Sequence, residues 1–261
     1  RRPVRSVASL FSVNISVKLF RELLHRLNRD NFLEVLDDLR LAGWQRKWQW
    51  IKEGFSELGG RMRTSWLGPF AFIAPLAFWS LVLGVIYGLI LGQDLTDYLA
   101  YLAVGLTLWR FITSCLLDSE GLFIAPPDSL ELTKPPLSGS LFHMTWVNIA
   151  ILFLQICFFL LVCSLFDLSN STSYLQILAA LVFLWINSLW LSLLIGILSL
   201  RIPDFKKHLT RFLPLLFLLS PILWKAEMVQ GWEFGIYLNP IYFLLDVTRS
   251  VLLGFTPAPS T

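Results

Sequence analysis

The side chains that could do chemistry in this sequence are few and isolated. It contains no GxSxG or HExxH motif and no cluster of paired carboxylates, so nucleophilic, zinc-dependent and acid–base catalysis have no recognisable centre. An enzyme would have to depend on isolated residues such as Asp118, Glu120 and His143. We therefore predict no catalytic residues, and we do not expect this chain to be an enzyme.

Nucleotide and metal sites also lack their usual signatures. There is no GxxxxGK[ST] motif, whose backbone amides and lysine hold nucleotide phosphates, so any ATP chemistry must belong to a partner. His25, His143 and His208 are far apart in the sequence, and the three cysteines lie inside apolar runs without forming a CxxC pair. This pattern predicts no metal site, and cysteines that act as small buried hydrophobic residues.

Arg110 is an unusual charged residue because it interrupts an otherwise uncharged run from Tyr98 to Leu117. If this run spans a membrane, a guanidinium that faced lipid would cost at least ~2.5–3.5 kcal/mol, so Arg110 is expected to face other helices or a wet cavity. Two roles fit this position. Arg110 could contact polar or anionic cargo, or it could form a structural ion pair with an acidic group of another helix or chain.

Trp79, Trp109 and Trp185 are the tryptophans that lie deepest inside the apolar runs. Most aromatic side chains in membrane helices serve packing or anchor the protein at the interface. An aromatic wall also suits a sugar polymer, because the C–H faces of pyranose rings stack on aromatic rings without fixing the polymer in one place. We therefore predict these three tryptophans as candidates for the wall of a channel.

The composition indicates the environment in which these residues work. Hydrophobic residues make up 56% of the chain and charged residues only 15%, against about 45–50% and about 25% in soluble domains. The net charge of +3 does not indicate nucleic-acid binding, because basic residues crowd into the first 63 positions and the short loops between apolar runs. That distribution is typical of a membrane protein with basic loops on its cytoplasmic side.

The first membrane span follows a basic and aromatic junction. Arg61 and Arg63 precede an uncharged run from Phe70 to Gln93, and Trp66 lies between the two arginines and this run. A helix of this length crosses a hydrocarbon core of ~30 Å at a rise of ~1.5 Å per residue. Arginines before the span predict that it starts on the cytoplasmic side, and the loops that follow continue a consistent alternation of sides.

The apolar pattern predicts five spans, at residues 67–92, 98–117, 141–166, 174–200 and 210–224. The fifth differs from the others because Pro214 and Pro221 interrupt it. It is either extended by its neighbours or turns back within the membrane, where protein or water must satisfy the freed backbone groups. Residues 225–254 are aromatic and apolar but too interrupted to count as a clean span.

The N-terminal part of the sequence predicts helices outside the bilayer. Residues 1–43 form an amphipathic pattern, typical either of a solvated cytoplasmic helix pair or of helices on a membrane surface. From Trp44 to Lys52, three tryptophans and three basic residues share nine positions, which favours a helix lying in the interface. We expect this interfacial helix at residues 44–66, with an interruption at Gly59 and Gly60.

Three stretches, taken in order, resemble the ABC-2-type permease subunits that export O-antigen, teichoic acid and capsular polysaccharides. The first is the basic Leu-Gly-Pro lead into span one at 61–69. The second is the aromatic pattern of 101–111 with Glu120 and Gly121. The third is the Asn-Pro segment of 238–242 with Asp246, Arg249 and residues 252–254.

This resemblance implies an all-α polytopic subunit with six spans, of which about five are visible here. It implies an amphipathic interfacial helix before span one and short re-entrant gate helices after span five. The subunit would form a homodimer around a channel in the bacterial plasma membrane, with its N-terminus in the cytoplasm. Two separate ATP-binding cassette subunits would bind ATP and Mg while a lipid-linked polysaccharide passes through the channel. Nucleic acid is not an expected partner.

The resemblance also assigns roles to residues. The loops that would couple to the ATPase carry Asp128, Glu131, Lys134, Asp204, Lys206 and Lys207. The gate region would include Trp224, Asn239, Pro240 and Tyr242. The joint between the interfacial helix and span one would consist of Arg61, Arg63, Gly68 and Pro69.

The domain organisation expected from these observations is a helical extension at 1–43, the interfacial helix, a permease domain at 67–254 and a tail at 255–261. The chain departs from the family in its long N-terminal part and in the absence of a sixth span. Two alternatives are a permease of the same class for a small lipid or drug, and an integral-membrane glycosyltransferase that would use acidic residues such as Asp118 and Glu120.

Overall fold

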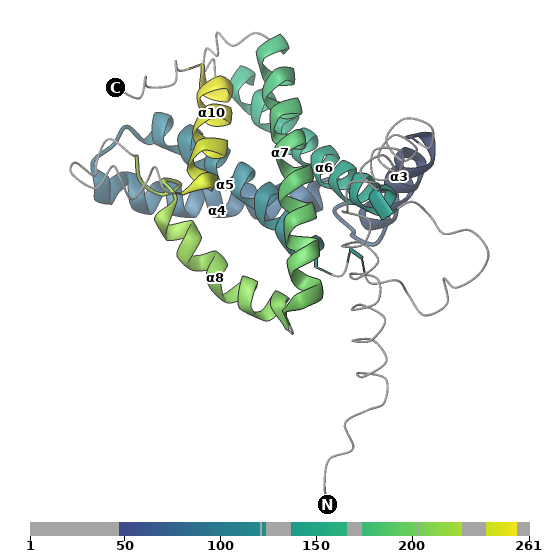
Figure 1. The fold of residues 1–261 in the computed structure, drawn as a ribbon. Helices are drawn as coiled ribbons and strands as arrows, with labels where there is room; N and C mark the ends of the chain where they lie inside the picture. Colours follow the sequence, from purple (N-terminus) through teal and green to yellow (C-terminus); the bar gives the residue numbers. More distant parts are fainter. Residues whose placement is uncertain are drawn as a thin grey trace, which may run out of the picture.

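The computed structural model describes residues 47–120, 122–123, 137–165, 174–202, 204–225 and 239–254. That part of the chain is helical and contains no strand. Its helices, in order, are α3 (Lys47–Arg63), α4 (Phe70–Leu91), α5 (Leu95–Asp118), α6 (Leu137–Leu165), α7 (Tyr174–Arg201), α8 (Phe205–Leu219) and α10 (Pro240–Leu253) (Figure 1). The predicted extension at 1–43 and the tail at 255–261 lie outside the described residues.

Four of these helices are long and apolar enough to cross a membrane, at Phe70–Leu91, Leu95–Asp118, Ser138–Ser164 and Leu175–Arg201. The prediction of an all-helical, membrane-embedded protein is therefore confirmed. The outer face of α4 agrees with this environment, because Trp79, Leu81, Leu89 and Ile90 are exposed although they are apolar. With 15 residues, α8 is not among the four helices, so the fifth span stays a prediction.

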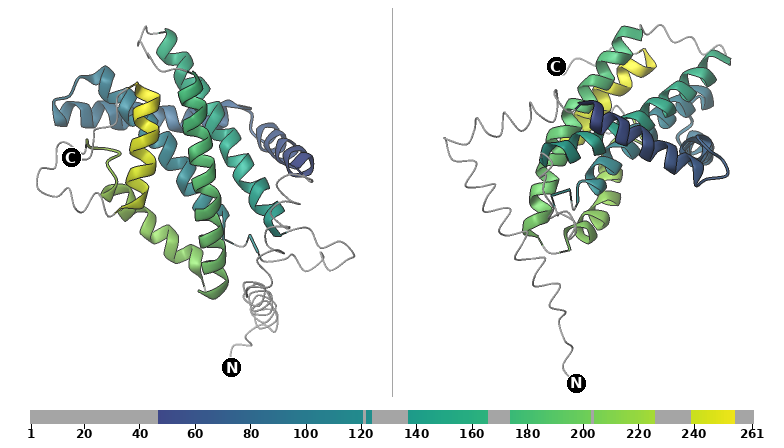
Figure 2. Two further views of the ribbon diagram at one scale, coloured as in Figure 1. Left: turned by 45° about the horizontal axis from the view of Figure 1, so that its top comes forward. Right: turned by 90° about the vertical axis from the view of Figure 1, so that its right-hand side faces the viewer.

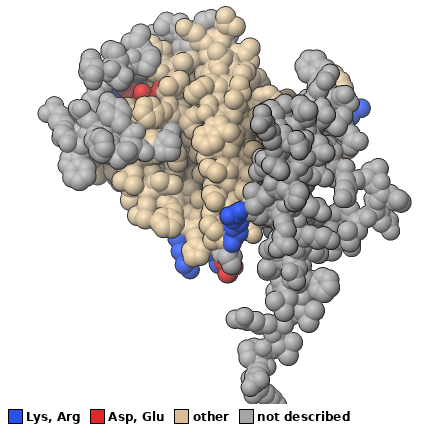
Figure 3. Space-filling model, viewed as in Figure 1, with Lys and Arg blue, Asp and Glu red and all other residues tan. Residues whose placement is uncertain are grey.

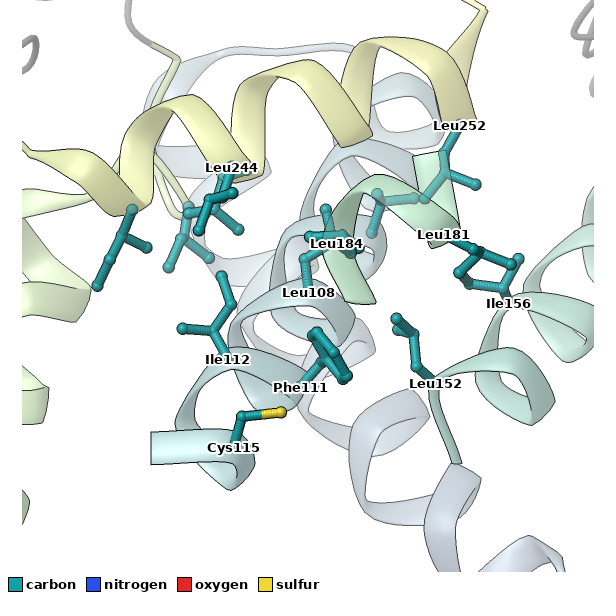
Figure 4. Close-up of a cluster of buried hydrophobic side chains, with 14 of the residues drawn as sticks. Leu108, Phe111, Ile112, Cys115, Leu152, Ile156, Leu181, Leu184, Leu244 and Leu252 are labelled. Carbon is teal, nitrogen blue, oxygen red and sulfur yellow. The ribbon is translucent and has the colours of Figure 1, made fainter. Parts of the chain in front are cut away.

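Helix α5 lies at the centre of the bundle and packs against α4, α6, α7, α8 and α10. Tyr98, Leu102 and Leu108 on α5 are fully buried. Figure 4 shows the middle of this core, where Leu108, Phe111, Ile112 and Cys115 meet side chains of α6, α7 and α10. The buried side chains of α5 are therefore held in fixed positions by neighbours on several sides.

Helix α3 lies beside α6 (Figures 1 and 2). The rings of Trp50 and Phe142 are stacked with their centroids 5.7 Å apart, and Leu58 packs against Val147 and Ile151. The contacts along one face of α3 recur at four-residue spacing, as the burial of Trp50, Gly54 and Leu58 shows. This face fixes α3 against α6 before the chain enters α4.

The predicted interruption at Gly59 and Gly60 is wrong, because α3 continues through both residues to Arg63. A glycine in a helix interior costs ~1 kcal/mol relative to alanine, but this penalty is local. Packing of the opposite face, through Trp50 and Leu58, outweighs it.

Charged side chains are sparse over the helices in the view of Figure 3 and gather at the lower end of α7 and α8. The turn between these helices and the first turns of α8 carry exposed Arg201, Lys206, Lys207 and Arg211. An apolar body with basic residues at one end is the distribution expected of a bundle whose loop meets the cytoplasm.

Candidate functional site

The end of α8 is the most unusual local structure among the described residues. Helix α8 ends at Leu219, after which Ser220 adopts an extended conformation and Pro221 follows. A proline disfavours the helical conformation in the residue before it and cannot donate a backbone hydrogen bond. The chain then turns into the bundle, where Pro221, Ile222 and Leu223 are buried.

The carbonyl groups freed by this break find donors on α5 and α10. The carbonyl oxygen of Pro221 accepts a hydrogen bond from Arg249 Nη1 at 2.7 Å and lies 2.9 Å from the hydroxyl of Tyr101. The same hydroxyl lies 3.0 Å from the carbonyl oxygen of Trp224, while the hydroxyl of Tyr98 donates to Leu223. The buried turn is thus satisfied by side chains far away in the sequence, as buried backbone requires.

Arg249 is the centre of this arrangement. Only 5% of the residue is exposed, and its guanidinium carbon lies 4.0 Å from the centroid of the Tyr101 ring. A cation at this distance from an aromatic face is stabilised by the ring quadrupole, more strongly where water is excluded. Its Nε and Nη2 atoms have no hydrogen-bond partner among the described residues, so the Tyr101 ring, the Pro221 carbonyl and the electrostatic attraction of Asp246 stabilise the charge.

Gly105 provides the space that Arg249 occupies. It stands one turn after Tyr101 on α5, and a Cβ atom added there would collide with Nη2 of Arg249. The absence of a side chain at Gly105 therefore lets the guanidinium lie against the α5 backbone. We call Tyr98, Tyr101, Gly105, Arg249 and the turn 220–224 the α8 clasp.

Two residues of the predicted gate region join the α8 clasp. Asn239 caps α10 by accepting a hydrogen bond from the amide of Ile241 at 3.0 Å, and its Nδ2 donates to Ser220 Oγ at 2.9 Å. The indole of Trp224 donates to the carbonyl of Leu218 at 3.2 Å. Asn239 thereby connects the start of α10 to the end of α8.

The other two predicted gate residues are placed in α10. Pro240 is its first residue, where a missing amide hydrogen has no consequence for the helix. The Tyr242 ring contacts the Phe243 ring with centroids 5.5 Å apart. Residues 226–238, where re-entrant gate helices are expected, lie outside the described residues.

The three tryptophans of the predicted channel wall have different neighbours within one chain. Trp79 on α4 is 54% exposed and contacts Phe78, whereas the ring of Trp109 on α5 lies 5.5 Å from that of Phe217 on α8. Trp185 on α7 donates to Thr145 Oγ1 on α6 at 3.3 Å. Their shared role in a wall stays a prediction.

The turn between α7 and α8 connects to the end of α5. Asp204 lies in the left-handed region with φ 56° and accepts a hydrogen bond from Lys207 Nζ at 2.8 Å, which lowers the pKa of its carboxyl group. Lys206 Nζ lies 3.6 Å from Glu120 Oε2. Asp128, Glu131 and Lys134, the other charged residues predicted for ATPase coupling, lie outside the described residues.

The joint between α3 and α4 occupies residues 64–69. Arg61 pairs with Glu57 at 2.6 Å in the last turns of α3, and Arg63 is exposed. Gly68 has φ +55°, a conformation that side chains other than glycine rarely adopt, and Pro69 leads directly into α4. The joint is therefore a defined turn.

Arg110 is exposed and lines a hollow between α4, α5 and α6, and its two predicted roles, contact with cargo or a structural ion pair, stay predictions. It forms no ion pair with any residue in the described ranges. Those ranges also hold no group of three or more histidine, cysteine or acidic residues that could bind a metal ion.

The comparisons with known proteins identify no relatives: no family model and no curated protein matches this chain. Tyr98, Tyr101 and Gly105 were missed as site residues, because two tyrosines and a glycine in an apolar run look like ordinary packing. The spacing of the two tyrosines at i and i+3 places them on one side of α5, which is the signal that could have found them.

Proposed function

We propose that this chain is the channel-forming permease subunit of an ATP-driven exporter of lipid-linked polysaccharide in the bacterial plasma membrane. The observation that carries the proposal is the α8 clasp. Non-helical backbone at membrane depth is tolerated where it is buried in protein or lines a water-filled cavity, and broken helices of this kind mark transport pathways. In this chain the break is held by Arg249 and Tyr101.

Partner subunits would supply the ATP hydrolysis. Because the chain lacks a phosphate-binding loop, ATP and Mg would be bound by two ATP-binding cassette subunits. The exposed, charged turn 204–207 at the start of α8 is a suitable docking element. Its contact to Glu120 at the end of α5 would carry a displacement of the turn to the helix that bears the α8 clasp.

A second copy of the chain would complete the channel. Trp79 is exposed on α4, so a partner that packs against this face or shares its lumen could bring Trp79 near other aromatic residues. Apolar and aromatic groups on such a wall would stack with sugar rings without holding them tightly. The homodimer and the polysaccharide both belong to this proposal.

The proposal is tested by reconstitution. The intact protein is purified together with an ATP-binding cassette subunit from the same cells, placed in proteoliposomes and supplied with lipid-linked polysaccharide and ATP. We expect the two proteins to co-purify and the polymer to move only when ATP is hydrolysed. Failure to bind any ATPase subunit would contradict the exporter function.

The same assay separates the alternatives. A permease for a small lipid or drug would transport a short-chain lipid when ATP is hydrolysed but would not transport the polysaccharide. A glycosyltransferase would need free acidic groups, whereas Asp118 accepts a hydrogen bond from Asn148 at 3.0 Å and Glu120 lies beside Lys206. If Asp118→Asn abolished a transferase signal from a sugar-nucleotide donor, the glycosyltransferase would be favoured instead.

A further inference from the structure

A polar hollow opens between α4, α5 and α6, next to the last turn of α3. Its volume is about 110 Å³, several times the space that a single water molecule needs. The polar residues that line it are Arg61, Arg110, Ser114, Asp118, Asn148 and Gln155. Polar groups are rare in membrane helices and mark functional sites where they gather around a cavity.

The spacing of these residues shows how two helices build the hollow. Arg110, Ser114 and Asp118 follow one another at four-residue intervals, so they share one face of α5. Asn148 and Gln155 are seven residues apart and share one face of α6. The hollow therefore has two facing polar rows, while Phe111, Ile151 and Leu152 provide apolar lining.

Most polar groups of the hollow already have partners within the chain. Asn148 Nδ2 donates to Asp118 Oδ2 at 3.0 Å, and Gln155 Nε2 donates to the carbonyl of Phe72 at 2.9 Å. Arg61 pairs with Glu57. These bonds fix the lining in place, but none of them neutralises Arg110.

Within the hollow, Arg110 forms no ion pair with a described residue, whereas Arg61 is paired with Glu57 and Asp118 accepts a hydrogen bond from Asn148. Asp118 stands eight positions later on α5, which at ~1.5 Å per residue places their backbones ~12 Å apart along the helix. An arginine at this depth can extend its side chain toward the membrane surface, which is where phosphate headgroups lie. A guanidinium also binds phosphate oxygens in a bidentate manner.

We propose that this hollow binds a singly charged phosphodiester, the headgroup phosphate of an anionic membrane lipid, with Arg110 as its main ligand. Arg61 is already paired with Glu57, so Arg110 is the positive charge of the lining that is left for a ligand, and a phosphodiester carries the one negative charge that matches it. Asp118 at the edge disfavours anions of higher charge, such as pyrophosphate, by repulsion. Helix α4 contributes Phe72 to the lining, and the apolar side chains exposed on this helix can contact acyl chains. This inference does not depend on the exporter function, because it requires neither ATP nor polysaccharide.

The binding test uses the purified full-length chain in nanodiscs of phosphatidylcholine with a minority of phosphatidylglycerol. Retention of phosphatidylglycerol on the protein is measured by native mass spectrometry and by titration with a spin-labelled phosphatidylglycerol. We expect Arg110→Gln to weaken this binding about tenfold, since it removes a charge-assisted hydrogen bond. We expect Arg110→Lys to retain part of the binding, because lysine keeps the positive charge but lacks the planar guanidinium that binds two phosphate oxygens at once.

Two further variants locate the effect. Asp118→Asn should strengthen phosphatidylglycerol binding and relax the discrimination against pyrophosphate. Arg63→Gln is the matched control, because Arg63 is exposed in the same turn as Arg61 but does not line the hollow. If Arg63→Gln and Arg110→Gln weakened binding equally, the binding would be unspecific surface attraction and the proposal would be wrong.

The remaining arms distinguish the source of the phosphate. Glycerol 3-phosphate and inorganic phosphate are added as soluble competitors, and the proposal expects neither to displace the spin-labelled lipid. Displacement by them would instead assign the site to a free phosphate. If Arg110→Gln left lipid binding unchanged but dissolved a dimer, Arg110 would pair with a second copy and the proposal would fail. If Arg110→Gln does not fold, the phosphatidylglycerol binding of Arg110→Lys and Asp118→Asn still tests the proposal.

Discussion

The guanidinium of Arg249 lies on the ring of Tyr101, 4.0 Å from its centroid, and both side chains reach the carbonyl of Pro221. The end of α8 is therefore held between the central helix α5 and the last described helix, α10. Tyr98 and Asn239 hold other atoms of this turn, so the specific contribution of the pair is to anchor the carbonyl of Pro221.

Removing the hydroxyl of Tyr101 should weaken the α8 clasp but leave the contact between the aromatic ring and Arg249 in place. Tyr101→Phe keeps the aromatic face for Arg249 but leaves the carbonyls of Pro221 and Trp224 with fewer donors. We expect a loss of about 1 kcal/mol in the free energy of unfolding, the usual net value of one hydrogen bond. The measurement is thermal unfolding in nanodiscs, and Tyr101→Leu, which also removes the ring, should cost clearly more. Equal losses in the two variants would show that the ring contributes nothing.

Gly105→Ala should disturb the same site through Arg249. The added methyl group would collide with Nη2, and Arg249 is almost fully buried, so its guanidinium has little room to move aside. We expect a destabilisation of about 1–3 kcal/mol, as for overpacked cores. Gly60→Ala on α3 is the matched control, because no atom lies near its added Cβ, and it should stabilise α3 by about 0.5–1 kcal/mol. A neutral Gly105→Ala would mean that Arg249 can move aside freely.

The sequence alone predicts the helices that dominate this fold. Helices α4 and α6 lie within uncharged apolar runs, and the length of such runs and the charges at their ends locate membrane helices within a few residues. The α8 clasp was not predictable in this way. The hydrogen bond from Tyr101 to Pro221 joins residues 120 positions apart, and no periodicity connects them.

The continuation of α3 through Gly59 and Gly60 was missed for a related reason. Local propensity opposes a helix there, and only the contact of Trp50 and Leu58 with α6 overrides it. For Arg110, the energetic cost of a charge in a span predicted a polar or shielded location. The residues that line the hollow with Arg110 could not be predicted, because their positions depend on the register between α5 and α6.

Reversing the charge of Lys206 should affect coupling more than stability. Lys206 and Glu120 are partly exposed, and such pairs contribute only about 0–1 kcal/mol. Lys206→Glu should therefore unfold almost as the wild type does, while export per ATP hydrolysed falls if this turn docks on the ATPase. The double variant Lys206→Glu with Glu120→Lys restores the pair within the chain. Recovery of export in the double variant would indicate that the internal pair matters, whereas persistent loss would indicate the partner surface.

The joint before α4 should depend on the conformation of Gly68. Its φ of +55° is unfavourable for alanine by about 1 kcal/mol, whereas asparagine tolerates this region better. We expect Gly68→Ala to lower the unfolding temperature and Gly68→Asn to have a smaller effect. In the reconstituted exporter, replacing Gly68 and Pro69 together by alanine should reduce export relative to ATP hydrolysis. Undiminished export with normal ATP use would make the joint a simple membrane anchor.

Alanine substitutions of the tryptophans in the predicted wall should separate effects on stability from effects on transport. Trp109 packs against Phe217, so Trp109→Ala is expected to destabilise the bundle by about 2 kcal/mol and cannot by itself identify a wall. Trp79 is 54% exposed, so Trp79→Ala should leave the unfolding temperature nearly unchanged. A loss of polysaccharide flux in this variant would then reflect contact with the polymer.

The matched control for Trp79 is Trp190 on α7, which is 50% exposed and lies outside the predicted wall. We expect Trp79→Ala to slow polymer export severalfold and Trp79→Phe to retain most of it, since a phenyl ring still stacks with a sugar face. Trp190→Ala should export at the wild-type rate. Initial rates in proteoliposomes with the ATPase subunit measure all three variants. Equal rates for Trp79→Ala and Trp190→Ala would place Trp79 against lipid, because an exposed indole that faces acyl chains has no part in moving the polymer.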